Sequence, residues 1–289
     1  MRILITGITG TIGTALSSLL LGEGHEIVGL SRDEFKQHHW PLKDRVKLYI
    51  GDVSNLDDCF LAGRGCDLII HTAALKHVDK MELNPLQAIR TNIVGTSNLV
   101  KMRKGLNIDR LVLLSTDKAV YPINVYGNTK AIAERLVLQD EGMVIRYGNV
   151  INSRGSVIET FSKQAEKGAQ ITITNSLMTR FFITIQEVAS FIANLATDLT
   201  VESGLYIPPM KACYITDLAK AVYEVINPDK TPEFISIGMR PGEKINECLL
   251  GRYEDIKGYY HDCKGDLYSD RVERFSRDEL FEIITGECE

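Results

Sequence analysis

Several features that would narrow the function of a protein are missing from this sequence. It has no C-x-x-C pair, no excess of positive charge, no long apolar run and no internal repeat. The six scattered cysteines argue against a disulfide framework or a zinc site, and predict reduced thiols in a cytoplasmic protein. A formal net charge of −5 gives no basic footprint for nucleic acid. No apolar stretch approaches the roughly 20 residues that a membrane-spanning helix needs, and we expect no metal site.

What is present is an ordinary globular composition, with 44% hydrophobic and 25% charged residues. The chain opens directly on an apolar strand at 2–6, so we expect no signal peptide. Strand and helix patterns then alternate as far as residue 150, which predicts an α/β fold built on a doubly wound parallel sheet. Further strands are expected at 26–30, 46–50, 68–71, 110–114 and 142–146, and a long helix at 85–103.

The first turn carries a glycine pattern, Gly7, Gly10 and Gly13, between a predicted strand and a predicted helix. Gly7 permits a tight turn, Gly10 lets the backbone approach a pyrophosphate, and Gly13 allows close packing of helix on strand. Glycines in a turn are common, but this context is typical of a dinucleotide-binding loop. The other residues expected to line the cofactor here are Thr9, Thr11 and Ile12.

The second predicted strand ends at Ser31, Arg32 and Asp33. A cofactor with a free ribose 2′-hydroxyl usually meets an acid at this position. Arg32 instead suits a 2′-phosphate through charge-assisted hydrogen bonds, with Ser31 adding a neutral one. The alternatives are a solvated surface arginine, or an Asp33 that points inward. The pattern therefore favours NADP over NAD.

Polar and small residues follow the next two strands. Asp52 could bond the adenine amino group with Val53 against the ring, or cap the following helix. Ala73 and Ala74 would leave room for the cofactor, and Lys76 could reach the cofactor, the substrate or solvent. A buried Asn92 needs a hydrogen-bond partner, and we expect it to brace the loop after residue 71.

The fifth strand leads into Thr116, Asp117 and Lys118, and a helix then starts near residue 125. Tyr126 and Lys130 share one face of that helix, so the ammonium could lower the pKa of the phenol. A phenolate is a suitable base for an alcohol being oxidised. The alternatives are a chance Tyr-x-x-x-Lys and a capped turn with a surface ion pair.

The glycine loop together with Tyr126 and Lys130 resembles the extended short-chain dehydrogenase/reductases. Within that family the sequence looks like the soluble, C5-inverting UDP-N-acetylglucosamine 4,6-dehydratases of pseudaminic acid biosynthesis. Thr116-Asp117-Lys118 with a retained Tyr126 is the feature specific to this subgroup. Further matching stretches lie at 31–34, 71–78, 146–150, 153–157, 178–182 and 240–244.

The resemblance implies a redox-neutral lyase that holds NADP tightly. Tyr126 would take the 4-hydroxyl proton while C4 is oxidised, with Thr116 bonded to that oxygen. Lys118 would then remove the C5 proton, and Asp117 would protonate the departing 6-hydroxyl. Lys130 would also contact the cofactor with Tyr126. The residues that the resemblance places at the substrate, UDP-N-acetylglucosamine, are Lys76, Asn149, Arg154, Val157, Thr179, Arg180, Arg240 and Glu243.

Guanidinium groups suit the diphosphate, although a surface ion pair is the ordinary alternative for any one arginine. We expect residues 1–152 to form the NADP-binding Rossmann domain, which also receives roughly 180–208. The smaller, interleaved substrate-binding region would comprise mainly 153–289. The expected assembly is a homo-oligomer in the cytoplasm, serving polysaccharide biosynthesis.

Three other functions remain open from the sequence. A UDP-sugar 4-epimerase shares Tyr126 and Lys130, but it has no need of an acid and a base at C5 and C6. A ketosugar reductase would consume NADPH stoichiometrically. A non-catalytic NADP-binding regulator could use the same fold, because fold does not fix function.

Overall fold

The computed structural model describes residues 1–153, 155–228, 230–252, 254–258, 260 and 265–286. These residues form two compact units. The first comprises 1–146, 186–208 and 255–262, and the second comprises 147–185, 209–254 and 263–289.

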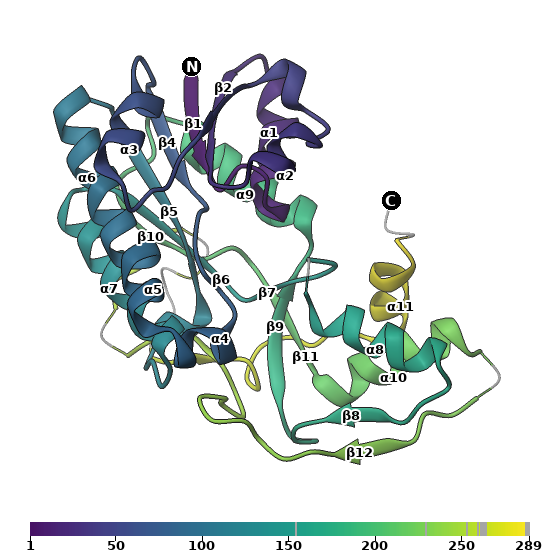
Figure 1. Ribbon diagram of the computed structural model, residues 1–289. Coiled ribbons are helices and arrows are strands. Elements are labelled where there is room, and N and C mark those ends of the chain that lie inside the picture. Colours follow the sequence, from purple (N-terminus) through teal and green to yellow (C-terminus); the bar gives the residue numbers. More distant parts are fainter. Residues whose placement is uncertain (154, 229, 253, 259, 261–264, 287–289) are drawn as a thin grey trace. The chain divides into compact units, whose positions relative to one another are not determined.

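A seven-stranded sheet organises the first unit, with strand order β10-β6-β5-β4-β1-β2-β3 (Figure 1). The order reverses beside β1, where β2 lies on one side and β4 on the other, and both pair parallel with it. Ligands of such sheets bind at the carboxyl ends of the strands near this reversal. The strands are β1 (Arg2–Thr6), β2 (Glu26–Ser31), β3 (Lys47–Ile50), β4 (Leu68–His71), β5 (Arg110–Thr116), β6 (Met143–Tyr147) and β10 (Gly204–Tyr206).

Helices cover both faces of this sheet. Figure 1 shows α3, α6 and α7 on one face, and α1 and α9 on the other. The central strands are apolar on both sides, and Ile3, Leu4 and Ile5 are fully buried, as a sheet covered on both faces requires. The helices are α1 (Thr11–Gly22), α2 (Glu34–His38), α3 (Leu56–Gly63), α4 (Val78–Leu83), α5 (Pro85–Ala88), α6 (Gly95–Leu106), α7 (Val125–Gln139) and α9 (Ile185–Thr197). The expected doubly wound α/β fold is confirmed.

The long helix expected at 85–103 differs in detail. It consists of α5, a π-helical segment Ile89–Val94 and then α6, which continues to Leu106. Asn92 lies inside the π segment, where its side chain is 1% exposed. Such wider turns often occur at functional sites, because they rotate one side chain out of the helical register.

Helices α8 (Val157–Glu166), α10 (Ile215–Ile226) and α11 (Arg277–Thr285) pack together in the second unit. Their apolar faces share one core, with Phe161, Phe182, Leu218 and Val222 at most 3% exposed. Three small sheets complete this unit, in the orders β11-β9-β7, β12-β8 and β13-β14. Their strands are β7 (Asn149–Val150), β8 (Ile171–Ile173), β9 (Thr179–Ile183), β11 (Lys211–Tyr214), β12 (Phe234–Ser236), β13 (Cys248–Leu250) and β14 (Leu267–Tyr268).

Candidate active site

The glycine loop lies between β1 and α1, and its geometry requires glycine at two positions. Gly7 has φ +68°, a left-handed conformation. A Cβ on Gly13 would come within 2.7 Å of the carbonyl oxygens of Gly7 and Ile8. A Cβ on Gly10 would meet the Gly7 oxygen at 3.1 Å. The loop therefore fits a pyrophosphate at the start of α1, where the helix dipole favours an anion.

The end of β2 is held by a buried amide. Gln37 Nε2 lies 2.9 Å from both the carbonyl oxygen and the hydroxyl of Ser31, and 2.8 Å from the Tyr49 carbonyl oxygen. Asp33 caps α2 by accepting a hydrogen bond from the Lys36 backbone, which lowers the pKa of its carboxyl. Because Asp33 is engaged in this cap, Arg32 is the remaining charged group at the strand end.

Arg32 is half-exposed and lies 3.4 Å from Asp52 Oδ2. Asp52 also accepts a hydrogen bond from the Ser54 backbone at 2.8 Å, while the cap of α3 is Asn55. The alternative that Asp52 caps this helix is therefore wrong. Val53 is 5% exposed and packs against the start of α6, where a Cβ on Gly95 would come within 2.6 Å of the Val53 Cγ2 atom.

The loop after β4 is braced as the sequence predicts. Asn92 accepts a hydrogen bond from the Leu75 backbone at 2.8 Å and donates to the Leu75 carbonyl oxygen at 3.0 Å. Ala73 lies against the glycine loop, with its Cα 2.8 Å from the position of a Cβ on Gly7. Ala74 is half-buried in the same loop, and Lys76 is exposed beyond it.

His71 takes no part in this candidate site. Its ring lies between Thr6 and Thr96, at 2.8 and 3.1 Å, and burial lowers the pKa of the imidazole to about 3. A histidine that stays neutral in this position joins β1, β4 and α6.

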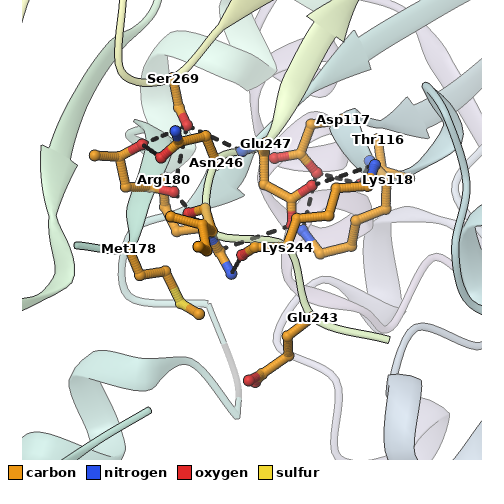
Figure 2. A network of polar contacts seen from close by, with 12 residues as sticks. Thr116, Asp117, Lys118, Met178, Arg180, Glu243, Lys244, Asn246, Glu247 and Ser269 are labelled. Carbon is orange, nitrogen blue, oxygen red and sulfur yellow. Dashed lines mark hydrogen bonds and ion pairs between the residues drawn. The ribbon is translucent and has the colours of Figure 1, made fainter. Parts of the chain in front are cut away.

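Thr116, Asp117 and Lys118 form a compact polar cluster where β5 passes into a 3₁₀ turn (Figure 2). Thr116 Oγ1 donates to Asp117 Oδ1 at 3.0 Å, and Lys118 Nζ donates to the same oxygen at 2.9 Å. Asp117 is fully buried, whereas the Lys118 side chain is 21% exposed. Asp117 Oδ2 is buried without a hydrogen-bond partner among the described residues. A buried carboxylate oxygen left unbonded is costly, so a donor from a ligand or from water would stabilise it.

Helix α7 begins at Val125, a short loop after that turn, and packs against it. Asn124 caps the helix by accepting a hydrogen bond from the Gly127 backbone at 2.7 Å. A Cβ on Gly127 would come within 2.2 Å of the Lys118 carbonyl oxygen, so only glycine permits this approach. The close packing sets Tyr126, on the first turn of α7, beside the Thr116–Lys118 cluster.

The electrostatics of Tyr126 differ from the sequence expectation. Burial raises the pKa of its phenol, and the ammonium of Lys118 and a hydrogen bond with Thr116 oppose that rise. Lys130 Nζ instead donates to the Leu114 carbonyl oxygen at 2.6 Å, and burial lowers the pKa of its ammonium to about 8. The expectation that Lys130 lowers the pKa of Tyr126 is therefore wrong: burial raises that pKa, and Lys118 is the ammonium that opposes the rise.

One buried ion pair of the site was missed from the sequence. Glu134 binds Arg146 with two hydrogen bonds, of 3.0 and 2.6 Å, and also accepts one from the Ser115 hydroxyl. Glu134 opposes the lowering of the pKa of Lys130. The available signal was Glu134 four residues after Lys130 on the buried face of α7, but nothing local indicated its partner on β6.

The second unit contains the other predicted binding residues. Asn149 is half-buried in β7, and Val157 begins α8 and packs against the core of this unit. Thr179 and Arg180 begin β9, and both are buried. Arg154 lies outside the described residues.

Arg240 and Glu243 form a turn on the surface of the second unit. Glu243 Oε2 accepts a hydrogen bond from the Arg240 backbone at 2.9 Å, and the Glu243 backbone donates to the Arg240 carbonyl oxygen at 3.1 Å. Gly242 has φ +81°, which suits glycine. The guanidinium of Arg240 is exposed and makes no hydrogen bond or ion pair with another described residue.

A family model described as "Polysaccharide biosynthesis protein" matches residues 3–264. The chain belongs to this family. It is 36% identical over 280 residues to UDP-glucose 4-epimerase from Rickettsia rickettsii, which covers 89% of the chain and 81% of that protein.

Two solved structures share the fold of this chain. Pen from Bacillus thuringiensis superposes with a TM-score of 0.89 and 31% identity, covering 99% of this chain and 97% of that one. DesIV, a dTDP-glucose 4,6-dehydratase from Streptomyces venezuelae with NAD and TYD bound, gives 0.79 at 18% identity, over 99% and 96%. At that identity the likeness to DesIV shows the fold alone. Within the described part of this family member, no helix is long and apolar enough to cross a membrane.

Proposed function

We propose that this protein is a C5-inverting UDP-N-acetylglucosamine 4,6-dehydratase that uses NADP. The observation that carries the proposal is the contact between Lys118 and Asp117, 2.9 Å apart, at the end of β5. Loss of water across C5 and C6 needs a base and an acid on one substrate, and this pair supplies both. The product is a UDP-2-acetamido-2,6-dideoxy-4-keto-hexose.

Tyr126 starts the reaction by accepting the proton of the sugar 4-hydroxyl, with Thr116 bonded to that oxygen. Burial raises the pKa of Tyr126, and the ammonium of Lys118 and the hydrogen bond with Thr116 oppose that rise, so the same triplet makes deprotonation of the phenol less costly. The resulting 4-ketone acidifies the proton on C5. When bound, NADP supplies a hydride acceptor for C4 and a hydride donor for C6.

The elimination uses the short Lys118–Asp117 contact. A proton that passes from Nζ to Oδ1 leaves a neutral amine beside a carboxylic acid, without changing the net charge of the pair. The amine then removes the C5 proton, and the acid gives its proton to the departing 6-hydroxyl, so one water is lost. Lys118, which is an ammonium again after it takes the C5 proton, or a neighbouring group then returns a proton to C5 from the opposite face, which inverts that carbon.

The residues present fit a dinucleotide. The glycine loop would hold the pyrophosphate, Asp52 and Val53 the adenine, and Lys130 with Tyr126 the nicotinamide end. Arg32 and Ser31 would meet the ribose 2′-phosphate, which is the reason to prefer NADP although DesIV was solved with NAD. In the second unit Arg240 is the exposed guanidinium suited to the UDP diphosphate, and Asn149 would bond the nucleotide sugar.

A second candidate, UDP-sugar 4-epimerase, is favoured by the 36% identity to UDP-glucose 4-epimerase from Rickettsia rickettsii. An epimerase removes and returns hydride at C4 and leaves C5 and C6 untouched. It would need Tyr126 and Lys130 but not the buried Asp117 with its unpartnered Oδ2. The Lys118–Asp117 pair is why we place dehydration first.

One incubation separates the candidates. Purified protein is mixed with UDP-N-acetylglucosamine in D₂O without added cofactor, and the products are examined by NMR and mass spectrometry. A dehydratase gives a 4-keto-6-deoxy sugar with deuterium at C5, and the coupling constants report inversion. An epimerase gives an isomer of unchanged mass without deuterium. NADPH-dependent product indicates a ketosugar reductase, and unchanged substrate from protein loaded with NADP would leave a non-catalytic regulator.

A further inference from the structure

Arg180 uses three of its five N–H donors on its own backbone. Its side chain is 9% exposed, and both terminal nitrogens donate to backbone carbonyls. Nη1 donates to Thr179 at 2.7 Å and to Ile245 at 2.9 Å, and Nη2 donates to Lys244 at 2.9 Å. One Nη2 hydrogen and the Nε hydrogen remain, and Nε lies 3.8 Å from a buried carboxylate oxygen of Glu247, so a phosphate would have to compete with that carboxylate.

A buried carboxylate accompanies the guanidinium. Glu247 is 3% exposed, and its Oε1 lies 3.8 Å from Arg180 Nε. Lys244 Nζ lies 3.8 Å from the other oxygen of the same carboxylate. The charge of Arg180 is therefore balanced inside the second unit, which is typical of a structural arginine rather than of an anion receptor.

Hydroxyl groups also hold residues 244–247 in place through hydrogen bonds (Figure 2). The Thr179 backbone donates to the Ile245 carbonyl oxygen at 3.1 Å, and its hydroxyl donates to Asn246 Oδ1 at 2.8 Å. That hydroxyl also lies 2.7 Å from Ser269 Oγ, which accepts a hydrogen bond from the Glu247 backbone at 3.0 Å. We call Thr179, Arg180, Glu247 and Ser269 the Arg180 clamp. It fixes residues 244–247, which lie more than 60 positions from β9 in the sequence.

The clamped segment directly follows the turn that carries Arg240 and Glu243. Hydrogen bonds between these two residues close the turn, while the guanidinium of Arg240 stays exposed. The two arginines therefore differ in their contacts. The guanidinium of Arg240 is exposed and can bind an anion, whereas the guanidinium of Arg180 is bonded to backbone carbonyls of its own chain.

We propose that Arg180 is a positioning residue, which holds residues 244–247 so that the preceding turn presents Arg240 to the diphosphate of a sugar nucleotide. The proposal rests on the proposed function for its ligand. It replaces the sequence expectation that Arg180 itself contacts the substrate.

A double-mutant cycle on UDP binding, measured by calorimetry, tests it. Arg240→Gln weakens UDP binding about tenfold or more. Arg180→Lys costs nearly as much although it keeps the charge, because one ammonium cannot bond both the Lys244 and Ile245 carbonyls. The double variant is then scarcely weaker than either single variant, since Arg180 acts through Arg240. The proposal would be overturned if the double variant lost UDP affinity by the product of the two single losses, or if Arg180→Lys kept the UDP affinity of wild type.

Uridine, which has no phosphate, provides the matched probe in the same experiment. Its affinity should be the same in wild type, Arg240→Gln and Arg180→Lys, because the expected loss concerns the diphosphate alone. Equal weakening of uridine and UDP binding in Arg180→Lys would mean general damage to the second unit, and would overturn the positioning role.

Amide hydrogen exchange measures the clamp without any ligand. Peptides that cover 240–250 should exchange at least tenfold faster in Arg180→Lys and be unchanged in Arg240→Gln. If Arg180→Lys folds poorly, Thr179→Val removes only the hydroxyl that joins Asn246 and Ser269, and should give a smaller increase. Unchanged exchange in both clamp variants would overturn the clamp. Wild type that fails to bind UDP would overturn the proposed function, while exchange still reports whether Arg180 holds the segment.

Discussion

The two units hold their polar groups in different ways. In the first unit, Thr116, Asp117 and Lys118 are neighbours in the sequence, and a strand end and a helix start fix their positions. In the second unit, Arg180 reaches a segment 64 or more residues away through side chain to backbone bonds. Regular secondary structure can therefore position catalytic groups by itself, whereas an irregular binding loop needs a buried side chain to give it one conformation.

The largest expected effect comes from removing one catalytic side chain of the first unit while the strand end and helix start that position it stay in place. Lys118→Ala should reduce dehydration of UDP-N-acetylglucosamine by about a thousandfold, because the base at C5 is lost. NADP binding should stay close to wild type, while the unfolding temperature should fall, because the buried Asp117 carboxylate loses its ion-pair partner. Product formation is measured by NMR, and Lys101→Ala, an exposed lysine on α6, is the control. Near wild-type turnover by Lys118→Ala would place the base elsewhere, with Lys76 as the next candidate.

The rigidity of that scaffold can be tested at Gly127. A Cβ here would come within 2.2 Å of the Lys118 carbonyl oxygen, so Gly127→Ala must displace the start of α7. We expect a loss of about 1–3 kcal/mol in the free energy of unfolding, together with reduced turnover. Denaturant titration measures the first. Gly22→Ala is the matched control, because its Cβ meets nothing within 4 Å and should be neutral or stabilising. Equal stability of both variants would show that the helix start is free to shift.

Acid should act on the first unit through His71. Its pKa falls from an ordinary value near 6.5 to about 3 on burial, so between those pH values the unfolded chain binds the proton and the folded chain does not. Stability is therefore lost as the pH falls below 6.5, by up to about 1.4 kcal/mol per pH unit. Unfolding free energies at pH 7 and pH 5 should differ by about 2 kcal/mol less in His71→Gln than in wild type. The exposed His38→Gln should leave that difference unchanged, and a wild-type-like difference in His71→Gln would contradict this account.

The smallest expected effect concerns an exposed arginine of the first unit. Arg32→Ala should weaken NADP binding about tenfold, because a charge-assisted hydrogen bond to the 2′-phosphate contributes about 1.4 kcal/mol or more. NAD binding should scarcely change. Fluorescence titration with both cofactors measures this, with the exposed Arg45→Ala as control. Equal weakening for NAD and NADP would make Arg32 only a surface charge that pairs with Asp52.

Much of the first unit follows from local sequence. Glycine spacing between a strand and a helix predicts the loop at Gly7, and apolar runs predict the strands of the parallel sheet. A polar residue on a buried helix face must find a partner, and this rule alone located the contacts of Asn92 with the loop after β4. In each case the deciding interactions are close in sequence, or follow from the order of strands.

The sequence by itself therefore determined the fold class, the order of the elements and the residue types gathered at the strand ends, because these depend on periodicity and turn chemistry. Tertiary structure alone decided that burial raises the pKa of Tyr126 and that Lys118, not Lys130, opposes the rise. It also decided that Arg146 pairs with Glu134, and that Arg180 is buried against carbonyls while Arg240 is exposed. The charge and length of a side chain are known from the residue type. Its burial and its distance from other charges depend on segments that meet only when the chain folds. Because electrostatic effects are governed by burial and distance, the sequence alone could not give them.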